Sequence, residues 1–535
     1  MASGPPIYRG AIEGYTNPAS VVPGEQIAFH ISSDIPRYSI EIARIGADRQ
    51  VVWLNQNLTG QSYPAAENAS THGCNWPAAL KLTVADDWPS GYYSVVMRGK
   101  STGGITVSGE MSFMVRSCRP GHDARILLQR ATNTDNAYNS WGGCTLYSGP
   151  NGPAQQVSFD RPFAGFWQNG PHFFDIDADC AQSLDQRTFS LQLQDAFAQH
   201  GIPLPPGCTI YVEKPGRLWY LFVCSMTYAI KRHADRLGVY DGFSEWANCW
   251  SRWELPFVAW AERAGYKIDY ATNSDLEFHP EILNGYRLVL SVGHDEYWSY
   301  PMRDHLEAYV ADGGNVAFFS GNTMWWQVRL ENAGRTVVCY KDYRQDPFYP
   351  SGNQRLLSTL TCHRLINHPE NRLTGVSFAY GGYHDFFDCH NDGPWSYTVD
   401  RPNHWVFQNT GLKRNDQFGA RDKIVGYECD GCDFEMRDGL PVPTGRDGTP
   451  ENFEILATAP AELSNADSSL DMVQEALYGT DTDKRHCPTG AAVLGTYQRG
   501  GTVFTTGCTN WSYGLRGGDE AVMQITRNIL DRLSQ

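Results

Sequence analysis

The chain has 535 residues, of which 41% are hydrophobic and 13% aromatic, so it can form more than one hydrophobic core. Its 43 lysines and arginines against 59 aspartates and glutamates give a formal net charge of -16, which argues against nucleic acid and anionic membranes as partners. No apolar run approaches the roughly 20 residues of a membrane helix, and the first residues lack the pattern of a signal peptide. We therefore expect a cytoplasmic protein of more than one domain.

The cysteine content indicates thiols rather than a disulfide framework. Fourteen cysteines in so long a chain are sparse, so we expect them to be reduced and mostly buried. Cys429 and Cys432 have the spacing of half a zinc site. No second pair of cysteines or histidines at ligand spacing accompanies them, which makes zinc the less favoured interpretation.

The first part of the chain carries repeated β-strand patterns. Pro, Gly, Asp and Asn separate the runs at residues 24–32, 38–46, 49–54, 79–84, 91–99 and 109–116. This pattern predicts an antiparallel β-sandwich over residues 1–118. Residues 116–123, RSCRPGHD, are typical of a linker, because strands begin to alternate with helices after them.

The second part, residues 119–535, has the alternation of an α/β domain. Strands are expected at 124–132, 266–272, 287–293, 315–321 and in a hairpin over 491–508, and helices around 255–265, 305–312 and 520–534. Residues 430–452 are rich in Gly and Asp and predict loops. Residues 164–250 break the alternation with aromatic and Pro-rich sequence, which indicates an insertion.

The stretch YRLVLSVGHDEYWS, residues 286–299, is the most informative one. A buried parallel strand ends at a glycine and delivers His294 and Glu296 beyond its carboxyl end, where open α/β sheets place their chemistry. The next strand delivers Asn322 to the same edge. His294 and Glu296 are two residues apart, so their side chains share a face of an extended chain. A neutral imidazole there could transfer a proton during catalysis, whereas the structural alternative is a histidine that only caps the strand.

Two other functions fit parts of this pattern. Ser320 stands at a strand-to-helix turn, where serine or cysteine hydrolases and amidotransferases hold a nucleophile, but GxSxG is absent and no cysteine takes that place. A non-catalytic protein could instead bind sugars or another ligand on tryptophans. The candidate tryptophans are Trp141, Trp298, Trp325 and Trp326.

Motifs along nearly the whole chain resemble one family, the large subunit of N,N-dimethylformamidase and its relatives. The first domain holds IEGYTNPASVVPGEQIAFHIS and WPSGYY. The second holds AYNSWGGCTLY, FDRPF, SVGHDEYWS, NVAFFSGNTMWWQVR, VCYKDY, IVGYE and TNWSYGL. The resemblance implies a glutamine-amidotransferase-like (flavodoxin-like) α/β domain preceded by an all-β immunoglobulin-like sandwich.

The resemblance also implies a mononuclear iron, Fe3+, held by two tyrosinates and one carboxylate. By motif position the carboxylate is Glu296 and one tyrosine is Tyr138. The second tyrosine is expected from SGYY, where the pattern of the relatives, Ser, Gly, any residue, then Tyr, favours Tyr93 over Tyr92. Neighbouring strand residues face opposite ways, so only one of the two can reach the metal. Three anionic oxygens suit a hard cation, and tyrosinate is a known iron ligand.

The resemblance places three more residues in the active site. Asn322 and Lys341 fall in segments that would stabilise negative charge or orient the substrate, and Glu428 would hold Lys341 or act as a second base. The implied reaction is hydrolysis of a small N-substituted amide, of the formamide type or a related one, to a carboxylic acid and an amine. Iron would polarise the carbonyl, and His294 would pass a proton to the leaving nitrogen.

The chain departs from the family in two ways that leave the substrate and the subunit partners open. It lacks the extra lectin-like domain of dimethylformamidase, and it has the insertion at 164–250 where relatives have a brief connection. We expect the insertion to cover the metal site. Dimethylformamidase also uses a small companion subunit, so both a companion subunit and a homo-oligomer stay open here.

Overall fold

The computed structural model describes residues 12–100, 106–149, 151–163, 249–386, 389–390, 395–426, 428–481 and 483–535. The described residues belong to one compact unit. The predicted insertion over 164–250 lies outside the described residues, apart from its last two positions. None of the helices in the described parts is long and apolar enough to cross a membrane.

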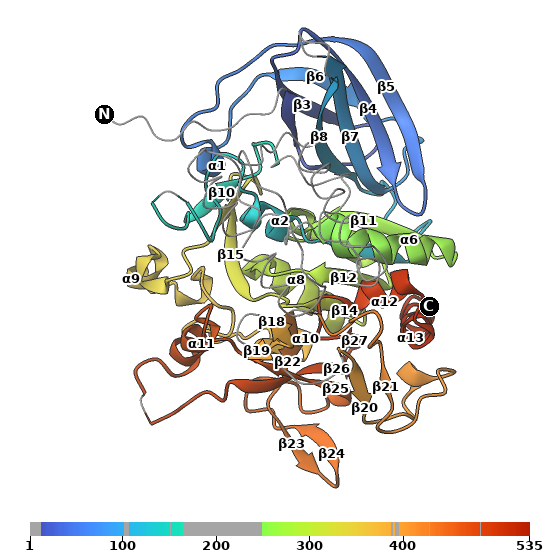
Figure 1. Ribbon diagram of the computed structural model, residues 1–535, viewed down its shortest axis with the longest axis vertical. Helices are drawn as coiled ribbons and strands as arrows, with labels where there is room; N and C mark the ends of the chain where they lie inside the picture. Colours follow the sequence, from blue (N-terminus) through green and yellow to red (C-terminus); the bar gives the residue numbers. More distant parts are fainter. Residues whose placement is uncertain are drawn as a thin grey trace, which may run out of the picture. The chain divides into compact units, whose positions relative to one another are not determined.

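The N-terminal part forms two β-sheets with a common hydrophobic core. The first sheet has the order β1 (Ile12–Asn17), β3 (Gln26–Ser33), β6 (Ala78–Thr83). The second has the order β2 (Ser20–Val21), β8 (Thr106–Val115), β7 (Gly91–Lys100), β4 (Arg37–Ile45), β5 (Arg49–Thr59), and Figure 1 shows its long strands side by side. Phe29, Ile42 and Phe113 are among the side chains that join the two sheets in one buried cluster.

All six strand runs predicted in this part are strands, because their alternating apolar residues face that shared core. The strand β1 was not among them, since Gly14 interrupts its apolar alternation. The immunoglobulin-like assignment and the domain boundary at residue 118 stay predictions.

The central sheet has a parallel half and an antiparallel half. The parallel strands stand in the order β11 (Ile268–Thr272), β9 (Ile126–Arg130), β12 (Leu288–His294), β14 (Asn315–Gly321), β27 (Gly501–Thr505). The antiparallel strands continue with β26 (Thr489–Arg499), β25 (Glu454–Glu462), β17 (Ser377–Tyr383) and β22 (Glu428–Gly431). Strand β20 (Tyr397–Val399) pairs with β25, and β21 (Gln417–Phe418) pairs with β20.

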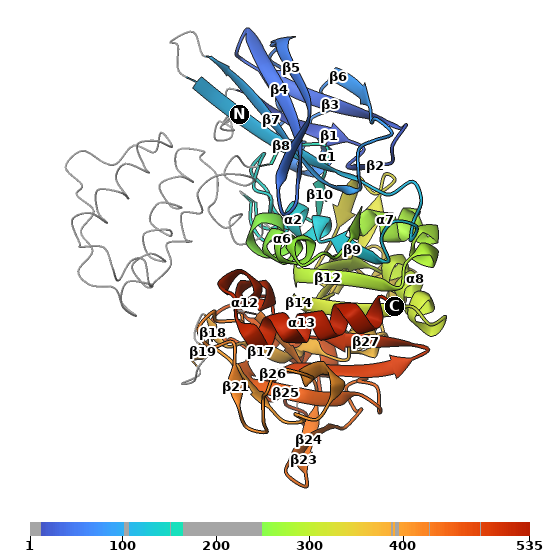
Figure 2. The same ribbon diagram turned by 90° about the vertical axis from the view of Figure 1, so that its right-hand side faces the viewer.

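Helices cover both faces of the parallel half, as the predicted alternation requires. Leu290 of β12 and Phe319 of β14 pack in one cluster with α6 (Leu255–Arg263), α12 (Trp511–Gly517) and α13 (Glu520–Leu533). Val289 and Phe318 point the other way, toward α7 (Asn273–Phe278) and α8 (Tyr300–Ala311). Figure 2 shows α13 lengthwise beside β14 and β27. The assignment to a glutamine-amidotransferase-like, flavodoxin-like fold stays a prediction.

The tract predicted as loops over residues 430–452 contains a hairpin, so that prediction was wrong there. Strand β23 (Phe434–Arg437) pairs with β24 (Leu440–Pro443). Asp438 and Gly439 form the two-residue turn with φ of 51° and 74°, the positive values that an Asp-Gly hairpin turn adopts. The strands were missed because each has only four residues and β24 carries two prolines.

A smaller four-stranded sheet continues the chain beyond the central strands. Its order is β10 (Gln156–Ser158), β16 (Thr336–Val338), β15 (Trp326–Glu331), β13 (Tyr297–Ser299). Strand β13 follows β12, and β15 follows β14, so the segments between them hold the predicted site residues. The short remaining elements are α1 (Ala69–His72), α2 (Thr132–Tyr138), α9 (Phe348–Ser351), α10 (Asn371–Thr374), α11 (Ser469–Tyr478), β18 (Asp385–Phe386), β19 (Cys389–His390), a π-helix at Trp250–Glu254, and 3-10 turns at Pro280–Gly285, Tyr343–Gln345, Gln354–Leu356 and Trp405–Phe407.

Candidate functional site

The site forms where β12 ends, as the sequence predicted. Gly293 has φ of 83°, and a Cβ there would lie 2.4 Å from Trp253 Cβ, so only glycine fits this turn. His294 and Glu296 follow it and are buried. His294 Nε2 lies 3.4 Å from Glu296 Oε2, which confirms that the two side chains face the same space.

Two tyrosines meet the carboxylate of Glu296. Tyr138 Oη donates a hydrogen bond to Glu296 Oε2 at 2.8 Å, and Tyr147 Oη donates one to Oε1 at 2.5 Å. The main-chain N–H of Glu296 donates to Thr134 Oγ1 at 2.9 Å, and Trp326 Nε1 donates to Tyr147 Oη at 3.0 Å. Each oxygen of Glu296 therefore has its own phenol, and the contacts fix the orientation of all three groups.

Burial sets the protonation of these three groups. It raises the pKa of Glu296, and burial together with the Glu296 charge raises the pKa of Tyr138 and Tyr147 well above the usual value. Tyr147 is 37% exposed, whereas Glu296, which accepts the hydrogen bond of its hydroxyl, is fully buried. Three groups that can each carry a negative charge thus meet at one buried carboxylate, which is an environment that a hard cation would stabilise.

Glu428 joins the site from the far strand of the sheet. His294 Nε2 lies 3.0 Å from Glu428 Oε2. A Cβ on Gly321 would lie 2.7 Å from the main-chain oxygen of Glu428, so this glycine lets β22 approach the end of β14. Burial lowers the pKa of His294 to about 3, which keeps the imidazole neutral at physiological pH. The prediction that Glu428 holds Lys341 does not match this position, because its contact is with His294.

Lys341 brings a cation close to Tyr147 and Glu296. Its main chain has φ of 59° and is held by Ser358 and Thr359. Its ammonium lies 2.9 Å from the ring centroid of Tyr147 and makes no hydrogen bond to any described residue. Burial lowers the pKa of Lys341 to about 7. A buried donor without a partner, aimed at a carboxylate site, is available to a ligand.

Asn322 stands on the neighbouring strand end. The sheet register pairs His294 with Gly321, so Asn322 begins the segment beside the one that holds Glu296. Its main-chain N–H donates to Asp430 Oδ1 at 2.8 Å, which helps to hold the unusual φ of 51°. Its side-chain Oδ1 is buried and has no hydrogen-bond partner among the described residues. Asp430 was not predicted as a site residue, although it follows Glu428 by two positions.

The structure does not bring Tyr93 together with Tyr138 and Glu296. The ring of Tyr93 is buried in the core between the first two sheets, and its hydroxyl donates to the main-chain oxygen of Pro89 at 2.6 Å. Tyr92 faces the opposite way and stacks on Trp250 at 4.2 Å between ring centroids. The expected ligand role of Tyr93 therefore finds no support in the geometry, and the same holds for Tyr92.

Tyr147 is the site residue that the sequence analysis missed. It lies in AYNSWGGCTLY, the same motif that gave Tyr138, nine positions further on. A helix end followed by two glycines folds back on itself, and Leu146 N–H donates to Ala137 O at 2.9 Å. This return brings the second tyrosine of the motif beside the first, with 4.8 Å between ring centroids. The two tyrosines of one motif were the available signal.

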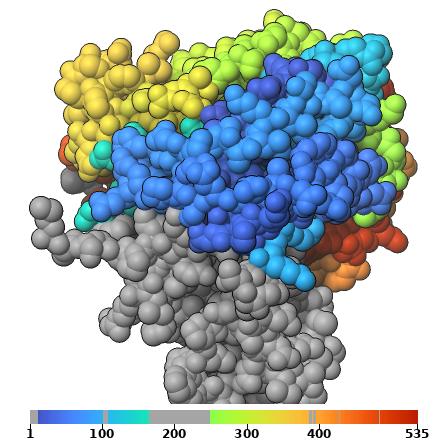
Figure 3. All heavy atoms as spheres, turned by 90° about the horizontal axis from the view of Figure 1, so that it is seen from above, coloured from blue at the N-terminus to red at the C-terminus, as the bar shows by residue number. Residues whose placement is uncertain are grey.

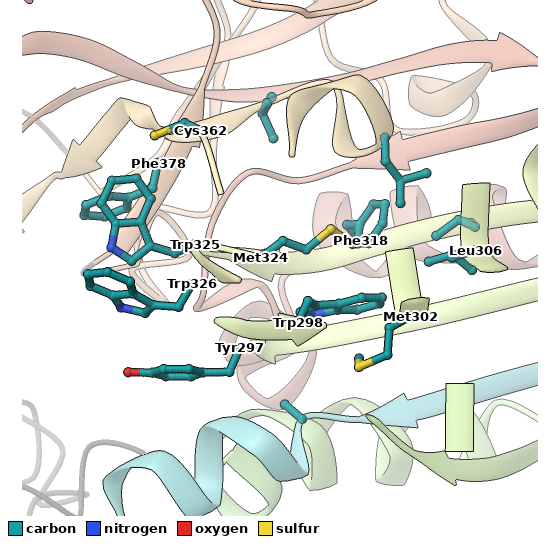
Figure 4. Close-up of a cluster of buried hydrophobic side chains, with 14 of the residues drawn as sticks. Tyr297, Trp298, Met302, Leu306, Phe318, Met324, Trp325, Trp326, Cys362 and Phe378 are labelled. Atoms are coloured by element: carbon teal, nitrogen blue, oxygen red, sulfur yellow. The ribbon is translucent and has the colours of Figure 1, made fainter. Parts of the chain in front are cut away.

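The alternative sites look structural. Ser320 Oγ is buried and contacts only Ser291 Oγ at 3.1 Å and Thr323 Oγ1 at 2.9 Å among the described residues, so it has no adjacent base. The tryptophans proposed as a ligand platform are all buried, and Figure 4 shows three of them within one hydrophobic cluster. They are Trp141, Trp298, Trp325 and Trp326. Cys429 and Cys432 are free buried thiols.

A metal at this site would need the tyrosines. Within the described parts of the chain, no group of three or more His, Cys, Asp and Glu side chains is arranged to hold a metal ion. The oxygen set of Tyr138, Tyr147 and Glu296 is of another kind, since two of its three members are phenols. Phenolate and carboxylate oxygens match the preference of ferric iron and not that of zinc or copper.

Comparison with known proteins points to one family. The model of the family described as "N,N-dimethylformamidase beta subunit-like, C-terminal" matches residues 39–524. The N,N-dimethylformamidase beta subunits of an Alcaligenes species and of Paracoccus aminophilus are 36% and 37% identical over 85 residues, which is 15% of this chain and 11% of each relative. The sporulation control protein Spo0M from Bacillus subtilis aligns over 22% of this chain and 53% of its own with 17% identity and a TM-score of 0.16.

The family match covers most of the chain and includes both the tyrosine motif and the ends of β12, β14 and β22. It also spans Lys341. The matched stretch is only a small part of the two named relatives, whose activity is a property of the whole proteins. The chain belongs to the N,N-dimethylformamidase beta subunit-like, C-terminal family.

Proposed function

We propose that the protein is an iron-dependent amidohydrolase that cleaves a small N-substituted amide, of the formamide type or a related one, to a carboxylic acid and an amine. The observation that carries the proposal is the meeting of two tyrosine hydroxyls on the two oxygens of Glu296, at the strand end where the family motif lies. The names of the relatives support the reaction class.

Iron would be held by Tyr138, Tyr147 and Glu296. All three are positioned by hydrogen bonds, and each can supply an anionic oxygen. When bound, ferric iron supplies Lewis acidity that favours attack of water on an amide carbonyl. Glu296 is fully buried, so a cation gains more from its charge there than it would at the surface.

Lys341 and Asn322 would bind the carbonyl end of the substrate. The ammonium of Lys341 is a buried donor that makes no hydrogen bond to a described residue. The side-chain Oδ1 of Asn322 likewise has no hydrogen-bond partner among the described residues. A positively charged donor that is fixed in place stabilises the negative charge that develops on the carbonyl oxygen. Trp326 and Tyr297, whose rings lie 4.5 Å and 5.8 Å from the ammonium, would exclude water from the same space.

His294 would transfer the proton. Its neutral imidazole can accept a proton from the attacking water and deliver it to the departing amine nitrogen. Glu428, at 3.0 Å from Nε2, would stabilise the imidazolium between these two transfers.

A panel of formamides, acetamides and arylamides tests this function. We expect the purified protein to release amine from at least one small N-substituted member and to lose that activity when a strong chelator removes iron. Amine release that survives complete iron removal would contradict the proposal.

Replacing Lys341 with methionine is expected to lower kcat/KM by about 10²- to 10³-fold, the usual cost of losing one donor to the developing oxyanion. Methionine keeps most of the side-chain volume beside Tyr147. Iron content should stay unchanged, because Lys341 is not a ligand. Steady-state kinetics with iron analysis on the same preparation checks both points, and an unchanged kcat/KM would remove Lys341 from the mechanism.

Replacing single tyrosines with phenylalanine tests whether the second tyrosine ligand is Tyr147, as the structure indicates, or Tyr93, as the sequence predicted. Tyr147→Phe is expected to weaken iron binding by at least about tenfold, since an oxygen of the set is lost. Tyr93→Phe removes a hydroxyl that only contacts Pro89 and should leave iron content unchanged. Iron retained by Tyr147→Phe but lost by Tyr93→Phe would restore the ligand set predicted from sequence.

The relatives are named beta subunits, which supports a companion subunit for this chain as well. The alternative is a homo-oligomer. Light scattering on the purified chain, before and after addition of a candidate small subunit, separates the two. The expected cytoplasmic location stays a prediction.

A further inference from the structure

Arg161, in the motif FDRPF, is a buried arginine that donates four of its five hydrogen bonds to residues 136–144. It is 1% exposed. Its Nε donates to Ser158 O at 3.0 Å, and its Nη1 donates to Trp141 O at 2.6 Å and to Cys144 O at 3.2 Å. Its Nη2 donates to the main-chain oxygen of Asn136 at 3.1 Å and to the side-chain oxygen at 3.3 Å. These five bonds use all five N–H donors of a guanidinium.

Four of the five acceptors belong to residues 136–144, which join the two tyrosines of the site. Asn136 lies two positions before Tyr138, near the end of α2. Trp141 and Cys144 lie between Tyr138 and Tyr147. One planar group therefore ties the helix end to two points of the loop.

Burying a guanidinium to hold a loop is favourable only if the relative positions of the loop carbonyls must be fixed. Burying a charge costs free energy, and no described carboxylate lies within salt-bridge distance of Arg161 to offset it. Only carbonyl oxygens face the charge. A loop that had merely to pack could use an apolar residue of the same size at lower cost, whereas a fork of five donors fixes several carbonyls relative to one another.

The first sheets hold the same loop from another side. The indole of Trp141 is fully buried, donates to Glu13 Oε1 at 3.1 Å and packs edge-on against Trp76 at 5.9 Å. Asn17 and Gln156 add hydrogen bonds between β1, α1 and the segment that carries Arg161. In Figure 3 the teal part of the chain borders blue atoms of the first sheets. The loop is thus fixed between two parts of the structure.

We propose that Arg161 is a positioning residue for the metal site: it holds residues 136–144 so that Tyr138 and Tyr147 present their hydroxyls to the same carboxylate. The proposal rests on the proposed function for the role of the two tyrosines as iron ligands. The position of Arg161 itself does not depend on iron.

Arg161→Lys on the full chain tests the proposal, with Arg401→Lys as the matched control. Lysine keeps the charge but has three donors in place of five. Arg401 also donates to two main-chain oxygens, those of Ile455 and Pro441, which lie far from the tyrosine motif in the sheet. We measure amide hydrogen exchange of residues 136–149, and the iron content and phenolate absorption band of the same samples.

We expect Arg161→Lys to speed exchange in residues 136–149 at least tenfold and to lower iron affinity by about 10- to 100-fold, the usual cost of losing a residue that orients ligands. Arg401→Lys should change neither readout. Unchanged exchange in residues 136–149, or faster exchange with full iron and an unshifted band, overturns the proposal. If the wild-type protein holds no iron, the proposed function fails, and faster exchange in Arg161→Lys still assigns Arg161 to the loop.

If Arg161→Lys does not fold, the variant Asn136→Ala tests the same proposal. It removes one of the five acceptors and leaves the guanidinium and its other bonds in place. We expect the same two effects, each smaller, and in the same segment. Exchange and iron content equal to those of the wild type would count against the proposal.

Discussion

Glu296→Gln is expected to lose bound iron and amide cleavage together. Glutamine keeps the size of the side chain but carries no charge, so the oxygen set loses the anion on which both tyrosine hydroxyls converge. Lewis-acid assistance is worth several kcal/mol, so activity should fall by roughly a thousandfold or more. Iron analysis and amine release on the same folded sample measure both quantities.

Glu370→Gln is the matched control for this change. Glu370 is as deeply buried as Glu296, and its carboxylate accepts a hydrogen bond from Ser377 Oγ at 2.5 Å, away from the tyrosines. Its substitution should cost stability and leave the iron content per folded chain unchanged. If Glu296→Gln kept its iron, or if both variants lost it equally, Glu296 would not be a ligand.

His294→Ala is expected to keep iron and to lose the rate of the chemical step. The imidazole lies beside Glu296 and Glu428 but is not part of the oxygen set, so its removal leaves the three ligands in place. General acid–base catalysis contributes about 10²- to 10⁴-fold, which sets the expected fall in kcat. Single-turnover kinetics on iron-loaded protein isolates this step.

His486→Ala controls for the loss of a buried imidazole. His486 is buried against Ala379 O, with 2.6 Å from Nε2 to that oxygen, and lies in the segment before β26. It should keep full turnover when folded. Full turnover in His294→Ala would make His294 structural, and Glu428 would become the next candidate base.

The strands that were predicted correctly are those whose sequence has a clear hydrophobic pattern. The strand before His294 and its neighbour before Asn322 read as nearly continuous apolar runs, and both are buried parallel strands. The hairpin at Phe434–Pro443 was missed because each of its strands has only four residues and β24 carries two prolines, which are typical of loops. The Asp-Gly turn between them was the better signal.

The sequence predicted the site residues that follow directly after a strand. It did not predict the residue that a loop brings back to the site. Glu296 and His294 follow from the spacing of two along one extended chain. Tyr147 reaches Glu296 because the two glycines after Trp141 let the chain turn back and Arg161 holds the turn, which are tertiary effects. Tyr93 was preferred because its motif is family-like, yet alternation along β7 points it into the sheet core.

Iron content and visible absorption of the protein purified without added metal test the central claim most directly. We predict near-stoichiometric iron and a phenolate-to-iron absorption band that both Tyr138→Phe and Tyr147→Phe diminish, because each phenol faces its own oxygen of Glu296. Stoichiometric zinc, no metal, or an absorption band that neither substitution changes would contradict the account.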